Sequence, residues 1–133
     1  MEEFTQEDWF LESVSEPSVP YRDLKERTKE FALSIVKYIQ SLPSNKITYR
    51  IGDQLLRSGT SVGSNTRASF RARSKKEYVA KVGIVIEEAD ESIFWLEILE
   101  SADIGNAEET KILKQEAEEL TKIFVSIYHK YKV

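Results

Sequence analysis

The stretch LKQEAEELTKIFVSIYHKY, residues 113–131, decides the fold class. Its apolar positions recur at alternating steps of four and three residues: Leu113, Ala117, Leu120, Phe124, Ile127 and Tyr131. This period matches one face of an α-helix and the seam of a helix bundle. A half-buried strand would alternate apolar and polar residues, and no run in the sequence does so.

Three earlier segments carry apolar positions at the same helical period. We predict helices over residues 21–42, 48–73 and 76–101, followed by the fourth over 107–132. Pro43 ends the first helix, and the turn signal Gly105-Asn106 separates the last two. Four helices of similar length with short links fold most simply as an up-down-up-down antiparallel four-helix bundle. The chain is therefore predicted to be all-α, with an acidic N-terminal arm at 1–20 and a bundle domain at 21–133.

The second predicted helix is unusual, because half of its core stripe is polar or small. A second face beside that stripe carries small and apolar residues, and the third helix has an apolar flank. Glycine is unfavourable in mid-helix unless it permits a close helix contact. We therefore expect Gly59 and Gly63 to mark such a contact. The surplus apolar surface predicts an oligomer interface, made by Leu56, Gly59, Gly63, Phe70, Ile84 and Trp95.

Few residues are available for chemistry. The 133 residues include no Cys and one His, His129, which excludes disulfides, Cys nucleophiles and any site that needs two imidazoles. We expect a non-enzymatic protein with no metal, no cofactor and no small-molecule substrate. No apolar run reaches the length of about 18 residues that a membrane span needs. The acidic start Met-Glu-Glu-Phe lacks the positive charge of a secretory signal, so a cytoplasmic location is expected.

The net charge of −4 hides a strong partition along the chain. Residues 50–83 hold eight basic and two acidic residues, which sum to +6, whereas residues 84–120 hold twelve acidic and two basic residues, which sum to −10. The predicted nucleic-acid-binding residues lie on an exposed arc of the second helix and just beyond it: Arg50, Arg57, Arg67, Arg71 and Lys75. Two interpretations are open. Their cationic groups bind phosphates, or they pair with the acids of the third and fourth helices.

The predicted arm is strongly acidic. Residues 1–20 contain six acidic residues and no basic one, a sum of −6, with one apolar cluster at Trp9, Phe10 and Leu11. One interpretation is a solvated arm. The other is that the apolar cluster docks on a groove of its own chain or of a neighbour.

Three segments resemble the signature of the 23S ribosomal RNA intervening-sequence protein family, also called four-helix bundle proteins. They are QLLRSGTSVGSN at 54–65, RARSKKEYVAK at 71–81 and EEADESIFWLEIL at 87–99. The resemblance covers about residues 21–132. It implies a four-helix bundle that assembles into a ring, typically a pentamer, with no enzymatic activity. A related branch is the accessory variability determinant of diversity-generating retroelements, which binds nucleic acid and a reverse transcriptase.

The chain departs from that family pattern at one position and in its overall charge. The family usually has Glu near position 68, where this chain has Ala68, and the nucleic-acid-binding branch should be basic. Two hypotheses for function remain. The first is an oligomer that binds RNA or another polyanion through its arginines. The second is a protein-interaction module whose acidic surface and tail meet a basic partner.

Overall fold

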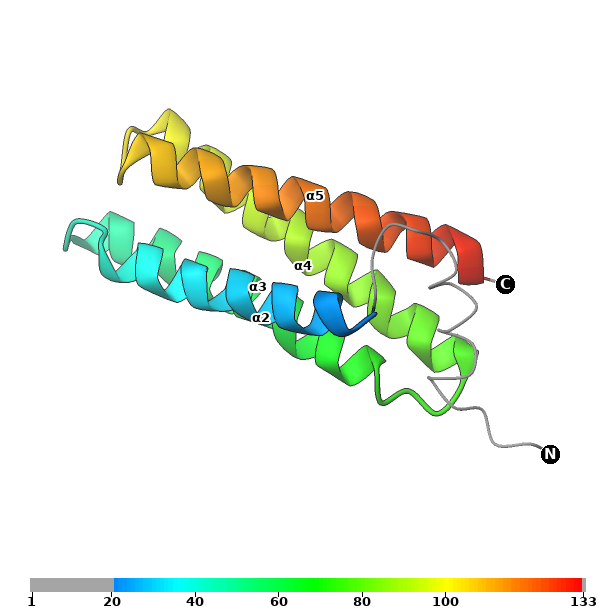
Figure 1. Cartoon of the computed structure of the whole chain (residues 1–133). Helices are drawn as coiled ribbons and strands as arrows, with labels where there is room; N and C mark the ends of the chain where they lie inside the picture. The colour runs from blue at the N-terminus through cyan, green and yellow to red at the C-terminus, as the bar shows by residue number, and fades with distance from the viewer. Residues whose placement is uncertain (1–20, 133) are drawn as a thin grey trace.

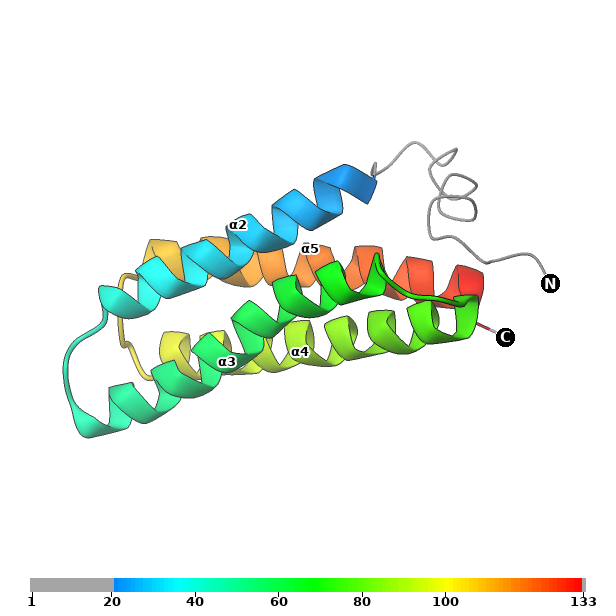
Figure 2. The ribbon, with the colours of Figure 1, turned by 90° about the horizontal axis from the view of Figure 1, so that it is seen from below.

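A computed structural model describes residues 21–132 and places them in four helices. They are α2 (Tyr21–Gln40), α3 (Lys46–Ser69), α4 (Lys75–Ser101) and α5 (Ala107–Tyr131). Consecutive helices run antiparallel, as Figure 1 shows, and the second view places α3 beside α4 along the length of the bundle (Figure 2). The part of the chain that the structure describes contains no strand. This confirms the predicted all-α four-helix bundle, while the arm predicted at 1–20 lies outside the described residues.

Short polar side chains fix where three of the helices begin. In each case the N-cap side-chain oxygen accepts a hydrogen bond of 2.9–3.1 Å from the backbone N–H three residues on: Asn45 from Thr48, Ser74 from Glu77, and Asn106 from Glu109. Such caps satisfy backbone donors that the helix itself leaves without partners.

The predicted end of the second helix was wrong by four residues. α3 ends at Ser69 rather than at residue 73, and the chain reverses over 70–74. The physical reason is the cap at Ser74, whose backbone is extended, with φ −151° and ψ 161°. An extended N-cap cannot belong to a helix that continues from α3, so residues 70–73 form the turn.

The seam of α5 forms one wall of the core. Leu113, Ala117, Leu120, Phe124 and Tyr131 are buried, and Ile127 is half-buried. Burial of a side chain as large as Phe124 contributes about 1.5–3 kcal/mol to stability. The α3 stripe is partly polar, as the sequence indicated. Its Ser58 accepts a buried hydrogen bond of 2.9 Å from Ser92 of α4, which satisfies hydroxyl groups that would otherwise be costly to bury.

The two glycines of α3 lie against α2 of the same chain. A Cβ added to Gly59 would lie 2.9 Å from Cγ1 of Ile35, and one added to Gly63 would lie 3.1 Å from the backbone oxygen of Thr28. The prediction of a close helix contact is therefore confirmed. Their assignment to an oligomer interface was wrong, because these positions are filled by α2 within the bundle.

α2 and α5 make fewer contacts than any pair of helices that follow one another in the chain. Polar groups bridge them. The Arg27 guanidinium donates hydrogen bonds of 2.8 and 2.7 Å to the two carboxylate oxygens of Glu116, and it also pairs with Glu119 at 2.9 Å. These bonds to Glu116 raise the pKa of Arg27 above its ordinary value. Tyr38 adds a buried contact of 2.6 Å between its hydroxyl and that of Thr110.

Candidate functional site: a basic pocket between α3 and α4

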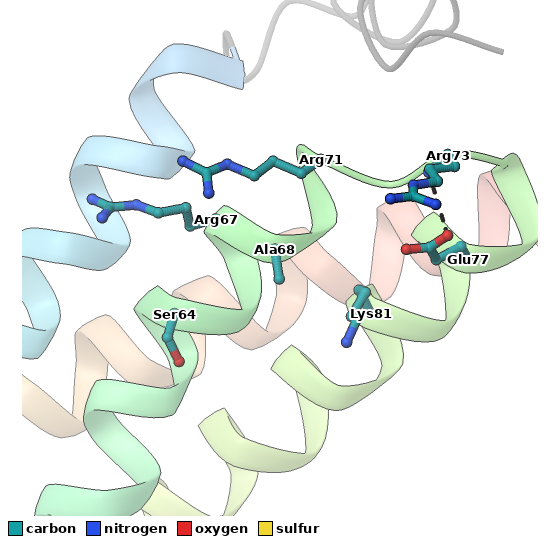
Figure 3. Close-up of a pocket in the computed structure, with 7 residues that line it drawn as sticks. All are labelled: Ser64, Arg67, Ala68, Arg71, Arg73, Glu77 and Lys81. Atoms are coloured by element: carbon teal, nitrogen blue, oxygen red, sulfur yellow. Dashed lines mark hydrogen bonds between the residues drawn. The ribbon is translucent and has the colours of Figure 1, made fainter. Parts of the chain in front are cut away.

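A pocket of about 440 Å³ lies where α3 turns into α4. We call it the basic pocket. Its lining residues come from the end of α3, the turn and the start of α4 (Figure 3): Ser64, Arg67, Ala68, Arg71, Arg73, Glu77 and Lys81. Four of these seven residues carry a positive charge and one carries a negative charge, so the pocket has a sum of +3.

The turn positions the cations. Arg67 lies in the last turn of α3, Arg71 and Arg73 lie in the segment 70–74, and Lys81 lies in the second turn of α4. The short side chains of Ser64 and Ala68 leave space between the two helices, as Figure 3 shows. The first turn of α4 adds the partial positive charge of a helix N-terminus.

The pocket cations are available to a ligand. Within residues 24–132, none of Arg67, Arg71, Arg73 and Lys81 takes part in an ion pair. The one pocket carboxylate, that of Glu77, accepts a hydrogen bond of 3.4 Å from the backbone N–H of Arg73. Guanidinium groups offer several donors in a planar fork that matches carboxylate and phosphate oxygens. The arrangement can therefore bind an anionic group.

Arg57 does not belong to this site. Its guanidinium pairs with Glu91 at 2.6 Å and with Glu88 at 3.4 Å, both on α4. The hydrogen bond to Glu91 raises the pKa of Arg57. Of the two interpretations, these contacts favour pairing within the chain for Arg57, because acidic side chains of α4 face it across the α3–α4 contact. Nucleic-acid binding by Arg57 stays a prediction.

Arg50 and Lys75 also lie apart from the basic pocket. Arg50 precedes Arg67 by 17 residues, which is about 25 Å along a helix. It lines a different pocket, with Trp95. The Lys75 ammonium lies over the ring of Tyr131, 5.6 Å from its centroid. The five predicted binding residues therefore do not form one surface, and only Arg67 and Arg71 reach the basic pocket.

Sequence reasoning missed Arg73 and Lys81. A helical wheel places residues by their angle around one helix axis. It does not apply beyond Ser69, where α3 ends, so it could not group Arg73 and Lys81 with Arg67. The signal that could have found them was the density of basic residues between 67 and 81, together with Ser74 as a helix N-cap.

The predicted apolar interface is only partly exposed. Leu56 is exposed, whereas Phe70, Ile84 and Trp95 are half-buried. The most exposed large apolar side chains of α3 are Ile47 at 69% and Tyr49 at 75%, and on α4 it is Phe94 at 52%. Tyr49 lines one pocket with Leu56 and another with Trp95, and the Trp95 ring contacts that of Phe94 with centroids 4.9 Å apart. We call Tyr49, Leu56, Phe94 and Trp95 the apolar strip.

Between residues 21 and 132, no three His, Asp or Glu side chains are grouped so that they could hold a metal ion. No helix in that range is both long enough and apolar enough to cross a membrane.

The fold and the pocket define a small four-helix bundle protein with a cationic site at one inter-helix turn. The sequence model of the 23S rRNA-intervening sequence protein family matches residues 22–126. The chain belongs to this family. Among solved structures it is similar to a protein of unknown function from the S23 ribosomal protein family of Bacteroides thetaiotaomicron VPI-5482. The two share 31% sequence identity with a TM-score of 0.74, over 79% of this chain and 97% of that one. No curated protein matches the chain.

Proposed function

We propose that this protein is a non-enzymatic binding module that holds RNA through the basic pocket. The observation that carries the proposal is the contrast between two kinds of arginine. Arg27 and Arg57 are paired with carboxylates of the bundle, whereas the pocket cations have no such pair within residues 24–132. Unpaired cations gathered around one pocket favour a phosphate ligand.

The proposal predicts a defined dependence on salt. Four pocket cations can contact about four phosphates, and the logarithm of affinity then falls with the logarithm of salt concentration with a slope of about −3 for single-stranded RNA. Binding of the full-length protein to an RNA hairpin with single-stranded tails, measured by fluorescence anisotropy over a range of salt, gives this slope. Affinity that does not change with salt would contradict the proposal.

A charge-reversal variant identifies the site. Arg67→Glu combined with Arg71→Glu should lower RNA affinity at least about tenfold, since each charged contact contributes about 1.5–3 kcal/mol. The matched control is Lys37→Glu with Lys111→Glu, which changes net charge equally at exposed positions of α2 and α5. If both variants lose the same affinity, overall charge rather than the basic pocket explains the binding. If the parent protein does not bind RNA at all, the alternative of a protein-interaction module with an acidic surface replaces the proposal.

We further propose that the protein is a homo-oligomer, in line with the pentameric ring that the family resemblance implies. The apolar strip supports this, because a contiguous exposed patch of large apolar side chains is typical of an interface. A ring would present several basic pockets to one RNA and raise its overall affinity.

Light scattering tests the assembly. A multiple of the 15.4 kDa chain mass is expected at micromolar concentration, and a pentamer has five times that mass. Tyr49→Lys with Phe94→Lys should shift the population toward the monomer, whereas Leu33→Lys with Ile112→Lys, at exposed apolar positions outside the strip, should not. A monomeric parent would contradict the assembly and leave the pocket proposal to be decided by the RNA measurement.

A further inference from the structure

The N-terminal arm carries a charge opposite to that of the basic pocket. Residues 1–20 sum to −6, with no basic residue: Glu2, Glu3, Glu7, Asp8, Glu12 and Glu16. The pocket sums to +3 from four cations and one carboxylate. Nothing else in the described chain neutralises those cations through an ion pair. The two regions are therefore complementary in charge.

The arm joins the bundle at the end where the basic pocket lies. α2 begins at Tyr21, directly after the arm. Thr28, in the first half of α2, packs against Gly63, and Gly63 lies one helical turn before Arg67. Figure 3 shows the side chains of Arg67 and Arg71 extending from the end of α3 toward α2. The point where the arm is attached and two of the pocket cations thus share one end of the molecule.

Chain length permits the contact. Glu16 precedes Tyr21 by five residues, a span of up to about 17 Å, and Glu2 precedes it by 19 residues, a span of up to about 65 Å. For comparison, the whole of α3 is only about 36 Å long. A tether of this length holds its carboxylates near the pocket at an effective concentration in the millimolar range. Such a concentration exceeds that of a dilute free ligand.

We propose that the acidic arm occupies the basic pocket of its own chain and competes there with RNA. Carboxylate and phosphate oxygens accept the same charge-assisted hydrogen bonds from guanidinium groups, so one pocket serves both. The arm then weakens RNA binding, because the affinity measured for RNA is the intrinsic affinity multiplied by the fraction of time in which the pocket is open. This regulatory role rests on the proposed function, whereas the arm–pocket contact itself does not.

The first experiment measures competition. In one variant the six acids of the arm are changed to their amides, Glu→Gln and Asp8→Asn. A control variant changes six exposed acids of α4 and α5 in the same way: Glu87, Asp90, Glu97, Glu108, Glu109 and Glu118. The net charge changes equally in both. RNA affinity at low salt should rise about tenfold more in the arm variant than in the control, as expected for a pocket covered about nine tenths of the time. An equal rise in both variants overturns the regulatory role.

The second experiment locates the arm without any RNA. The chain has no Cys, so paired spin labels can be attached at Ser13→Cys and Ala80→Cys. Ala80 is exposed on α4 next to Lys81. A control pair uses Ser13→Cys and Ser101→Cys, about 32 Å further along α4. We expect a short, narrow distance distribution for the first pair only, and Arg67→Glu with Arg71→Glu should broaden it.

The outcomes separate the two proposals. A broad distribution that the pocket variant leaves unchanged overturns the arm–pocket contact, whether or not RNA binds. A short distance that is lost when labelled protein is diluted with unlabelled protein overturns the assignment to the same chain, because the arm then reaches a neighbour's pocket. A short distance in a protein that binds no RNA supports the contact and contradicts only the proposed function.

Discussion

The middle of α3 and its C-terminal end carry the same kind of side chain in opposite surroundings. In the middle, Arg57 faces the acidic side of α4 and pairs with Glu88 and Glu91. At the end, Arg67 and Arg71 line the basic pocket together with two other cations, Arg73 and Lys81. The sequence partition explains the difference, since the acids of α4 begin at Glu87 and only Glu77 precedes them in the helix.

The comparison shows how one helix divides its charges between stability and binding. A paired arginine stabilises the contact between two helices, although modestly when it is exposed. Cations held near one another without counter-ions repel, which disfavours the free protein slightly and favours any anion that enters. The two regions should therefore respond in opposite ways to the same substitution.

Arg71→Glu is expected to have the largest effect on binding. It removes a donor from the basic pocket and adds a carboxylate, so RNA affinity should fall at least about tenfold. The melting temperature should stay the same or rise, because repulsion among the cations is relieved. Anisotropy and thermal unfolding measured on the same sample test both parts. A clear loss of stability would mean that Arg71 has a structural partner.

Ala68→Glu tests the same comparison by adding a negative charge inside the basic pocket. The new carboxylate would lie among the cations and neutralise one of them, so we expect an affinity loss of about three- to tenfold, smaller than for Arg71→Glu. The matched control Ala68→Gln has nearly the same size and no charge. If the Gln variant loses as much affinity as the Glu variant, space in the pocket matters rather than charge.

Arg57→Glu should give the opposite pattern. Three carboxylates would then face one another between α3 and α4, so the melting temperature should fall by a few degrees. RNA affinity should change no more than it does in the Lys37→Glu and Lys111→Glu control. High salt should reduce the loss of stability, because it screens exposed charges. A marked, specific loss of RNA affinity would return Arg57 to the binding surface.

The smallest expected effect is a loss of stability at alkaline pH. Burial raises the pKa of Tyr38 and of Tyr78 above the ordinary value of about 10. The fold thus favours the neutral phenols, and this part of the stability is complete below pH 10 and is lost as the pH rises through the folded pKa values. Denaturant unfolding at pH 8 and pH 11, with Tyr38→Phe for comparison, measures the loss.

Most of the fold could be predicted because the spacing of apolar residues in each helix indicates which of its faces is buried. The seam of α5 is continuous, and α2, α4 and α5 begin and end within two residues of the predicted limits. The end of α3 could not be predicted in the same way. Residues 70–73 continue the helical pattern of charge, and only the competing cap at Ser74 shows that the chain must turn there.

The candidate site was predicted only in part, for a related reason. Arg67 and Arg71 were identified because they are exposed on or near a helix. Whether an exposed arginine is paired depends on which side chains the neighbouring helix places at the same position along the bundle axis. To know this, one needs the register between α3 and α4. That register pairs Ser58 with Ser92, and it consequently places Arg57 opposite Glu91.

The order of helix contacts also bears on how the chain reaches this fold. Among the four described helices, every extensive contact joins helices that follow one another in sequence, and the smaller α2–α5 contact joins the first of them to the last. Its ion pair between Arg27 and Glu116 spans 89 residues. Bundles dominated by such local contacts fold in microseconds to milliseconds. Loop-closure entropy delays this distant contact, so we expect α2 and α5 to meet last during folding and to separate first when the native protein fluctuates.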